Sequence, residues 1–143
     1  MRFLIIPTPA TSDTKPGAEE AFDEKLFTAQ MKYNEEMYKA GVLVASEGLN
    51  PAATGAHVAI TGGKRTVVDG PFAETKELVA GFWLLEVKSK EEAIAWAMRC
   101  PIGPRDEVLE IRQLTGPADL PPELVQLIVA AAPTWSSAFA GAR

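Results

Sequence analysis

The chain has 143 residues, a length that fits one domain with a substantial hydrophobic core. Its hydrophobic content of 47% and charged content of 23% are those of an ordinary globular protein. The net charge of -5, with lysine and arginine scattered along the chain, argues against nucleic acid as the main partner, because no basic stripe offsets phosphate repulsion.

The first part of the chain is predicted to form a strand, a long helix and a second strand. Residues 2–6 carry apolar side chains on both faces of a strand, which indicates burial on both sides. Residues 19–40 are predicted to be helical, because acidic residues gather at the start and apolar residues recur at three- and four-residue steps. The apolar stripe consists of Phe22, Leu26, Ala29, Tyr33 and Met37. Gly41 ends the helix, and residues 42–45 form the second strand.

The middle of the chain is predicted to form a hairpin and a further strand. Residues 57–61 and 64–69 flank the Gly62-Gly63 pair, a strong signal for a two-residue turn. Residues 80–87 form a strand that is again apolar on both faces, with Phe82 and Leu84 opposite Trp83, Leu85 and Val87. We expect Trp83 to pack in a dimer core or to line its cavity.

The last part is predicted to contain a helix, a strand and a C-terminal helix. Ser89 and Glu92 form a capping box for a helix over residues 89–100, and residues 107–114 form the last strand. A C-terminal helix begins at Pro121 or Pro122 and ends near residue 132, after which the chain is expected to be loose.

The element order β-α-β-β-β-β-α-β predicts a ferredoxin-like α+β domain over residues 1–115, with an inserted β-hairpin and a C-terminal helical extension over residues 116–143. Its helices can cover only one face of the sheet. A second copy, the C-terminal helix or a ligand must therefore cover the other face. Self-association is the most economical of these alternatives, and we expect a homodimer.

The run D-G-P-F-A-E-T-K-E over residues 69–77 concentrates backbone constraints and charge between two strands. An aspartate in a turn commonly accepts a hydrogen bond from the N–H two residues later, but that residue here is Pro71, which has none. The Asp69 carboxylate must find a later N–H, a cation, water or a ligand. The alternative interpretation is a solvated turn that only fixes the geometry of the strands.

This run resembles the signature of the DGPF group within the YCII-related family. Further similar segments follow in order over residues 31–49, 62–66, 80–87 and 91–101. The resemblance implies a dimeric ferredoxin-like domain of the α/β-barrel type, but no defined activity. DGPF-group proteins are often associated with alternative sigma factors, which implies a role in transcriptional control.

The resemblance raises an enzymatic expectation that the sequence meets only in part. Short YCII-related proteins are thought to pair a histidine on the first helix with a nearby aspartate. Here the corresponding stretch holds Gln30, Lys32 and Asn34, and none of these is a general base near neutral pH in the manner of histidine. The sole histidine, His57, opens the inserted hairpin and is interpreted as an edge or surface residue.

We carry two functional hypotheses. In the first, a small molecule binds at the dimer cavity and signature loop, where Asp69 and Glu47 are candidate acid–base residues because close carboxylates shift each other's pKa. Its binding residues are Arg65, Phe72, Glu74, Lys76, Trp83 and Arg112. In the second, the protein is a non-catalytic accessory or regulatory module linked to sigma-factor-dependent transcription, and the signature loop contacts a protein partner.

No cofactor, metal, membrane or disulfide is expected. One histidine and one cysteine far apart in the chain cannot build a closed zinc site, and no phosphate-loop or dinucleotide-binding pattern occurs. No segment approaches the roughly 20 apolar residues of a membrane helix. The single cysteine, Cys100, follows an apolar helical run and is interpreted as a packed residue in a reduced, cytoplasmic protein.

Overall fold

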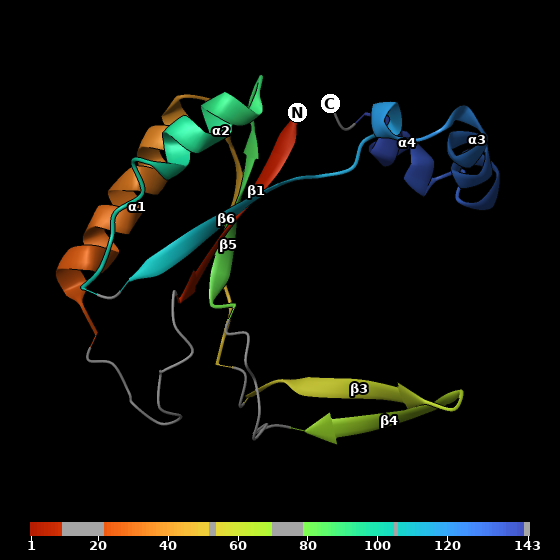
Figure 1. Cartoon of the computed structure of the whole chain (residues 1–143), viewed down its shortest axis with the longest axis horizontal. Helices are drawn as coiled ribbons and strands as arrows, with labels where there is room; N and C mark the ends of the chain where they lie inside the picture. Colours follow the sequence, from red (N-terminus) through yellow and green to blue (C-terminus); the bar gives the residue numbers. More distant parts are fainter. Residues whose placement is uncertain (10–21, 52–53, 70–78, 105, 142–143) are drawn as a thin grey trace.

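The computed structural model describes residues 1–9, 22–51, 54–69, 79–104 and 106–141. Four strands form an antiparallel sheet in the order β2-β5-β1-β6 (Figure 1). They are β1 (Arg2–Pro9), β2 (Leu43–Gly48), β5 (Gly81–Glu86) and β6 (Glu107–Gln113). Helices α1 (Glu24–Lys39) and α2 (Lys90–Ala97) both lie on one face of this sheet. The α+β, ferredoxin-like prediction is confirmed.

Both helices begin where the sequence supplies a capping side chain. The Asp23 carboxylate accepts a hydrogen bond from the Leu26 N–H at 3.0 Å, and the Ser89 hydroxyl accepts one from the Glu92 N–H at 3.1 Å. The first helix therefore starts at Glu24, later than the predicted residue 19. Phe22, which the pattern assigned to the apolar stripe, precedes the cap and is exposed.

The core lies between the sheet and the two helices. Its fully buried members come from β1, β5 and α1, and they are Phe3, Ile5, Leu85 and Met37. Tyr33 of α1 and the small Ala93 and Ala97 of α2 complete the contact, since alanines let the short helix approach the strands closely. The predicted stripe of α1 is confirmed at Tyr33 and Met37, and α2 buries Ala93 and Ala97 while Ile94 and Met98 are exposed.

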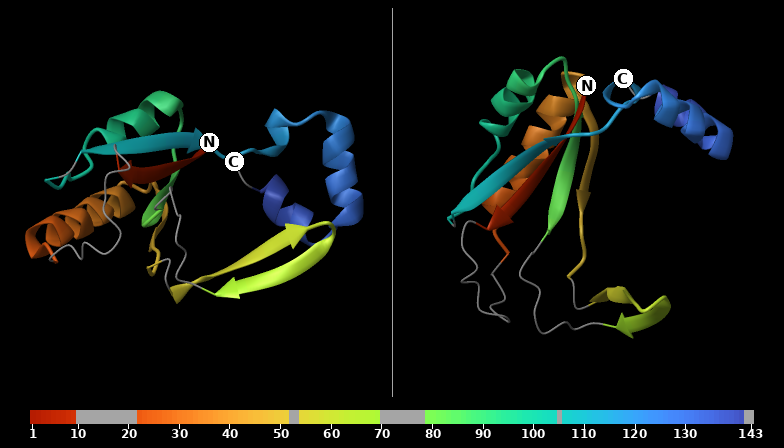
Figure 2. Two further views of the ribbon diagram at one scale, coloured as in Figure 1. Left: turned by 60° about the horizontal axis from the view of Figure 1, so that its bottom comes forward. Right: turned by 45° about the vertical axis from the view of Figure 1, so that its right-hand side comes forward.

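The inserted hairpin is a separate two-stranded sheet formed by β3 (Ala56–Thr61) and β4 (Lys64–Asp69). Gly62 and Gly63 both adopt positive φ, of 57° and 76°, as a two-residue turn of this hand requires. The hairpin leaves the end of the main sheet and extends on the side away from α1 and α2 (Figures 1 and 2).

The C-terminal extension contains a short 3-10 turn, η2 (Pro117–Asp119), followed by α3 (Pro122–Ala131) and α4 (Trp135–Ala140). The expectation of a loose end after residue 132 was wrong, because α4 forms there with Trp135 stacked on Phe139 at 5.3 Å. Both helices lie beyond β6, beside the sheet (Figure 2). Within the described part of the chain, no helix is both long and apolar enough to cross a membrane.

Gly81 is predicted to be the residue of the sheet that tolerates a methyl group least. A Cβ at this position would lie 2.6 Å from the Glu47 carbonyl oxygen on the neighbouring strand. Gly81→Ala should lower the free energy of unfolding by about 1–3 kcal/mol, measured by urea denaturation, because the backbone must shift. Gly48→Ala is the matched control, since Gly48 pairs with Gly81 and a Cβ added at Gly48 would meet no atom within 4 Å. Equal stability of the two variants would contradict the prediction.

Candidate binding face

The face of the main sheet opposite the helices is the first candidate site, and we call it the open face. Residues directly opposite each other in neighbouring antiparallel strands share a face. The pairs Ala45–Leu84, Leu84–Leu4 and Leu4–Arg112 therefore form one row across all four strands of the open face. Phe82 and Ile6 lie on the same side, two residues along their strands. The middle of the open face is apolar, and its residues are only half-buried.

Charged residues lie at both edges of the open face. Glu47 on β2 is opposite Phe82, and on β6 Glu110 is opposite Ile6. Arg112 also belongs to this face, and its Nε is 4.0 Å from a Glu110 carboxylate oxygen in an exposed ion pair. The two edges are three strand spacings apart, about 14 Å, so Glu47 and Arg112 flank the face without touching.

Trp83 lies on the other face, inside the protomer. It belongs to the row Ser46–Trp83–Ile5 and is buried under α1, where its ring meets Tyr33 edge-on at 5.8 Å between centroids. The sequence placed this side chain in the dimer core or cavity, whereas the structure places it in the core of one chain. Its strand neighbours Phe82 and Leu84 occupy the open face instead.

Asn34 provides the hydrogen-bond acceptor for the indole N–H of Trp83. The Asn34 side-chain oxygen accepts a hydrogen bond from the indole N–H at 2.7 Å, and its amide nitrogen donates to the Ser46 hydroxyl at 3.1 Å. Sequence reasoning treated Asn34 only as an occupant of the stretch where a histidine was sought. A usable signal was its position beside Tyr33, at the border of the buried stripe, where a polar side chain needs a partner. Both ends of Asn34 are thus engaged in joining α1 to the sheet.

The hairpin holds two other predicted site residues, and both are exposed. Asp69 is opposite Ala56 at the base, and Arg65 is opposite Ile60 close to the turn. These two lie on one face of the hairpin, four residues apart, which separates them by about 13 Å along the strand. Glu47 belongs to the other sheet. Glu47 and Asp69 therefore come from different sheets, and the convergence of their carboxylates with a cation from Arg65 or Lys76 stays a prediction. The predicted residues Phe72, Glu74 and Lys76 lie outside the described residues.

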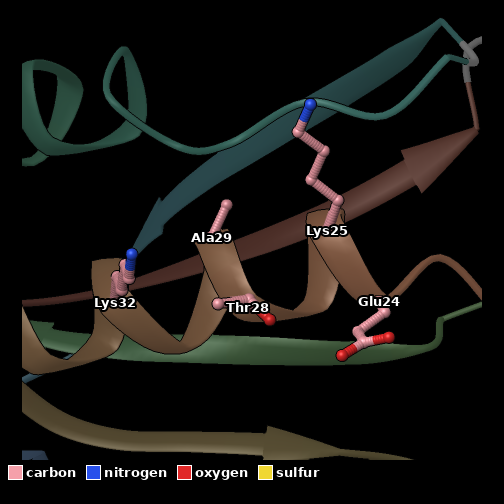
Figure 3. A pocket seen from close by; sticks show the side chains of 5 residues that line it. All are labelled: Glu24, Lys25, Thr28, Ala29 and Lys32. Carbon is pink, nitrogen blue, oxygen red and sulfur yellow. The ribbon is translucent and has the colours of Figure 1, made fainter.

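Two shallow hollows lie on α1, and neither contains a residue predicted for the site. The larger, of about 550 Å³, is lined by Glu24, Lys25, Thr28, Ala29 and Lys32. Figure 3 shows Lys25 and Lys32 pointing to the same side of the helix, with Ala29 between them. The second, of about 430 Å³, lies between the first turns of α1 and the segment Pro101–Pro104. Exposed lysines on a helix form a solvated surface, so neither hollow adds a candidate catalytic or binding residue.

The titratable side chains of Tyr33, which is buried, and Cys100, which is half-buried, contribute to the packing of the core. Tyr33 donates a hydrogen bond from its hydroxyl to the Trp96 carbonyl at 2.6 Å, and burial raises the pKa of this tyrosine above its ordinary value. Burial, with a smaller contribution from Glu107, raises the pKa of the Cys100 thiol to about 11. A thiol in that state is a poor nucleophile. Among the described residues, no group of three or more histidine, cysteine, aspartate or glutamate side chains could hold a metal ion.

Comparison with known proteins identifies the family. A model of the YCII-related domain matches residues 1–115, which is most of the chain, so the chain belongs to this family. An uncharacterised protein of Rhizobium meliloti (strain 1021) is 37% identical over 87 residues, which cover 61% of this chain and 67% of that protein. A solved structure is also similar, that of 5-chloro-2-hydroxyhydroquinone dehydrochlorinase from Burkholderia phenoliruptrix AC1100 in complex with 2,5-dihydroxybenzoquinone. Its TM-score is 0.40 at 13% identity, with 82% of this chain and 97% of that chain covered.

Replacement of Asn34 is expected to destabilise the fold. Asn34→Leu keeps the size of the side chain but leaves the Trp83 indole N–H without its acceptor, which should cost about 1–3 kcal/mol in urea denaturation. Ser46→Ala is the matched control, since it removes only the weaker partner of Asn34 and should cost about 0.5–1.5 kcal/mol. An Asn34→Leu protein as stable as the wild type would show that this contact is dispensable.

Cys100 is predicted to resist alkylation in the folded protein. A pKa of about 11 against the ordinary 9.0 leaves about 100-fold less thiolate at pH 8, and the rate with iodoacetamide should fall in proportion. The rate should rise as the pH approaches 11, while protein unfolded in urea should react like free cysteine. Folded and unfolded protein reacting at one rate would contradict the prediction.

Proposed function

We propose that this member of the YCII-related family is a homodimer that binds a small molecule between the open faces of its two sheets. The observation that carries the proposal is the pattern of the open face, which is apolar along β1 and β5 and charged along β2 and β6. Small-molecule sites combine apolar walls with a few placed polar groups, and this face has both.

The ligand class follows from this lining. Leu4, Ile6, Phe82 and Leu84 suit a compact, largely apolar body. Glu47, Glu110 and Arg112 suit polar or ionisable groups at its ends, with Arg112 as a bidentate partner for a carboxylate. Pairing two such faces would exclude water and strengthen each polar contact.

Glu47 is our candidate acid–base residue on the open face, with Asp69 of the hairpin as the second carboxylate. Dimerisation would lower the solvation of both and place them where they could exchange a proton with a bound ligand. Arg65 and the signature residues Phe72, Glu74 and Lys76 are assigned to binding in the same proposal, which treats the chain as a protein of the DGPF group.

A second candidate function is favoured by the contacts of Asn34. This residue occupies the stretch where short family members are thought to carry histidine, and both of its polar groups are used to fix Trp83 and Ser46. A chain with this architecture suits a non-catalytic accessory protein linked to sigma-factor-dependent transcription. In that case the hairpin and signature loop contact a protein partner, and no ligand competes for the open face.

A charge placed on the open face should abolish both dimer and ligand binding. Leu84→Glu would bury a carboxylate between two sheets, at a cost of several kcal/mol, and should give a monomer in sedimentation equilibrium. In a thermal-shift screen against a metabolite library, a ligand at 100 times its Kd stabilises the wild type by about 2.7 kcal/mol, and Leu84→Glu should lose this shift. Ala95→Glu, on the exposed side of α2, is the control and should behave as the wild type.

The same screen separates the two candidate functions. A ligand whose shift is lost in Glu47→Gln or Asp69→Ala, with the dimer intact, supports the small-molecule site and its carboxylates. A dimer that responds to no ligand supports the accessory role. A wild-type protein that is monomeric at all concentrations would overturn the proposal.

A further inference from the structure

The inserted hairpin presents one largely apolar face that nothing in the described part of the chain covers. The pairs Val58–Val67 and Ile60–Arg65 place these four side chains on the same face, together with Ala56 and Asp69. All twelve strand residues are exposed, and Ile60 and Val67 each retain 67% of their accessible surface. The opposite face carries His57, Ala59, Thr61, Lys64, Thr66 and Val68 and is the more polar of the two.

A two-stranded hairpin with an exposed apolar face needs another layer to pack against. An isolated two-stranded hairpin is marginally stable in water at best, and packing against another layer is what gives it independent stability. Branched apolar residues such as Val58, Ile60 and Val67 stabilise a strand when they pack against neighbours on the sheet surface. The three of them lie side by side on the face that they share with Arg65 and Asp69, which is the more apolar of the two, so this face is the one to be covered.

The position of the hairpin points to a second copy of the chain as the occupant. The hairpin extends to the side of the main sheet opposite α1 and α2, which is the side of the open face (Figures 1 and 2). Strands of six residues reach about 20 Å, which matches the width of about 19 Å for a four-stranded sheet. A partner chain bound at the open face would therefore lie within reach of the hairpin.

The area of the open face also indicates that a second copy of the chain covers the hairpin. Four short strands present a flat area of only about 400 Å², from their spacing and rise. A stable and specific interface buries about 800 Å² on each partner. Two hairpins, related by the two-fold axis of a homodimer, would supply much of the missing contact because each covers the other protomer.

We propose that the Val58–Ile60–Val67 face of each hairpin packs on the partner protomer and carries Arg65 to the partner's open face. This inference rests on the homodimer of the proposed function and deepens it, because each site then contains residues of both chains. Arg65 shares the face that becomes buried, and a buried guanidinium needs a carboxylate. The open face offers Glu47 and Glu110, which are exposed at its edges.

The test compares adjacent residues on the two faces of the hairpin by sedimentation equilibrium. Val67→Glu should raise the dimer dissociation constant at least about 100-fold, because the new carboxylate is desolvated against the partner. Thr66→Glu adds the same charge on the other face and should stay within about threefold of the wild type. Arg65→Glu should weaken the dimer about tenfold or more, while Lys64→Glu, with the same charge change on the other face, should not.

Each outcome decides the proposal. Circular dichroism of every variant establishes that the main domain is folded, and the Arg65 and Lys64 variants change residues that are already charged and exposed. Equal weakening by both members of a pair, or by neither, would overturn the proposal. If Leu84→Glu gives a monomer while Val67→Glu and Arg65→Glu leave the dimer unchanged, the hairpin proposal fails and the open-face dimer stands. A monomeric wild type removes both.

Discussion

One sheet with two apolar faces and helices on only one of them is the constraint on which the rest of this structure depends. α1 and α2 bury the face that contains Phe3, Ile5 and Leu85, and the reverse side is left with Leu4, Phe82 and Leu84. Apolar area buried from water is worth about 25 cal/mol per Å², so an uncovered face of this kind favours association strongly. The hairpin and the C-terminal helices stand beside this face, and both also expose apolar side chains, such as Leu127 on α3, that no described residue covers.

The contact between α1 and the sheet uses a polar side chain for structure. Asn34 hydrogen-bonds to Trp83 and Ser46, so this residue of the stretch in which a histidine was sought belongs to the boundary of the core. The remaining polar groups available for chemistry are carboxylates and arginines at the rim of the open face and on the hairpin. In the homodimer proposed above these groups would lose solvent, which strengthens their contacts with a ligand.

Tyr33 and Cys100 illustrate the opposite case, in which burial in the core of one chain raises the pKa of a group. Both have raised pKa values through burial, and both lie near the junction of α1 and α2 on the helical side of the sheet. Their neutral forms are the stable ones, and the Tyr33 hydroxyl is used to bind the Trp96 carbonyl. The charged groups at the edges of the open face, Glu47, Glu110 and Arg112, are by contrast exposed in the single chain.

Local pattern determined the elements of this protein. Asp23 and Ser89 cap the helices, Gly62-Gly63 turns the hairpin, and the repeat of Tyr33 and Met37 defines the buried stripe, because each of these effects acts within a few residues. The family and the ferredoxin-like order of strands also followed from the sequence. The tertiary structure decided which face of β5 the helices cover, because the sequence of a strand that is apolar on both faces does not distinguish them. Only the structure therefore shows that Trp83 lies in the core of one chain and not at the predicted site. It also placed Glu47 and Arg65 in different sheets, because the pairing of distant strands depends on packing that no short segment encodes.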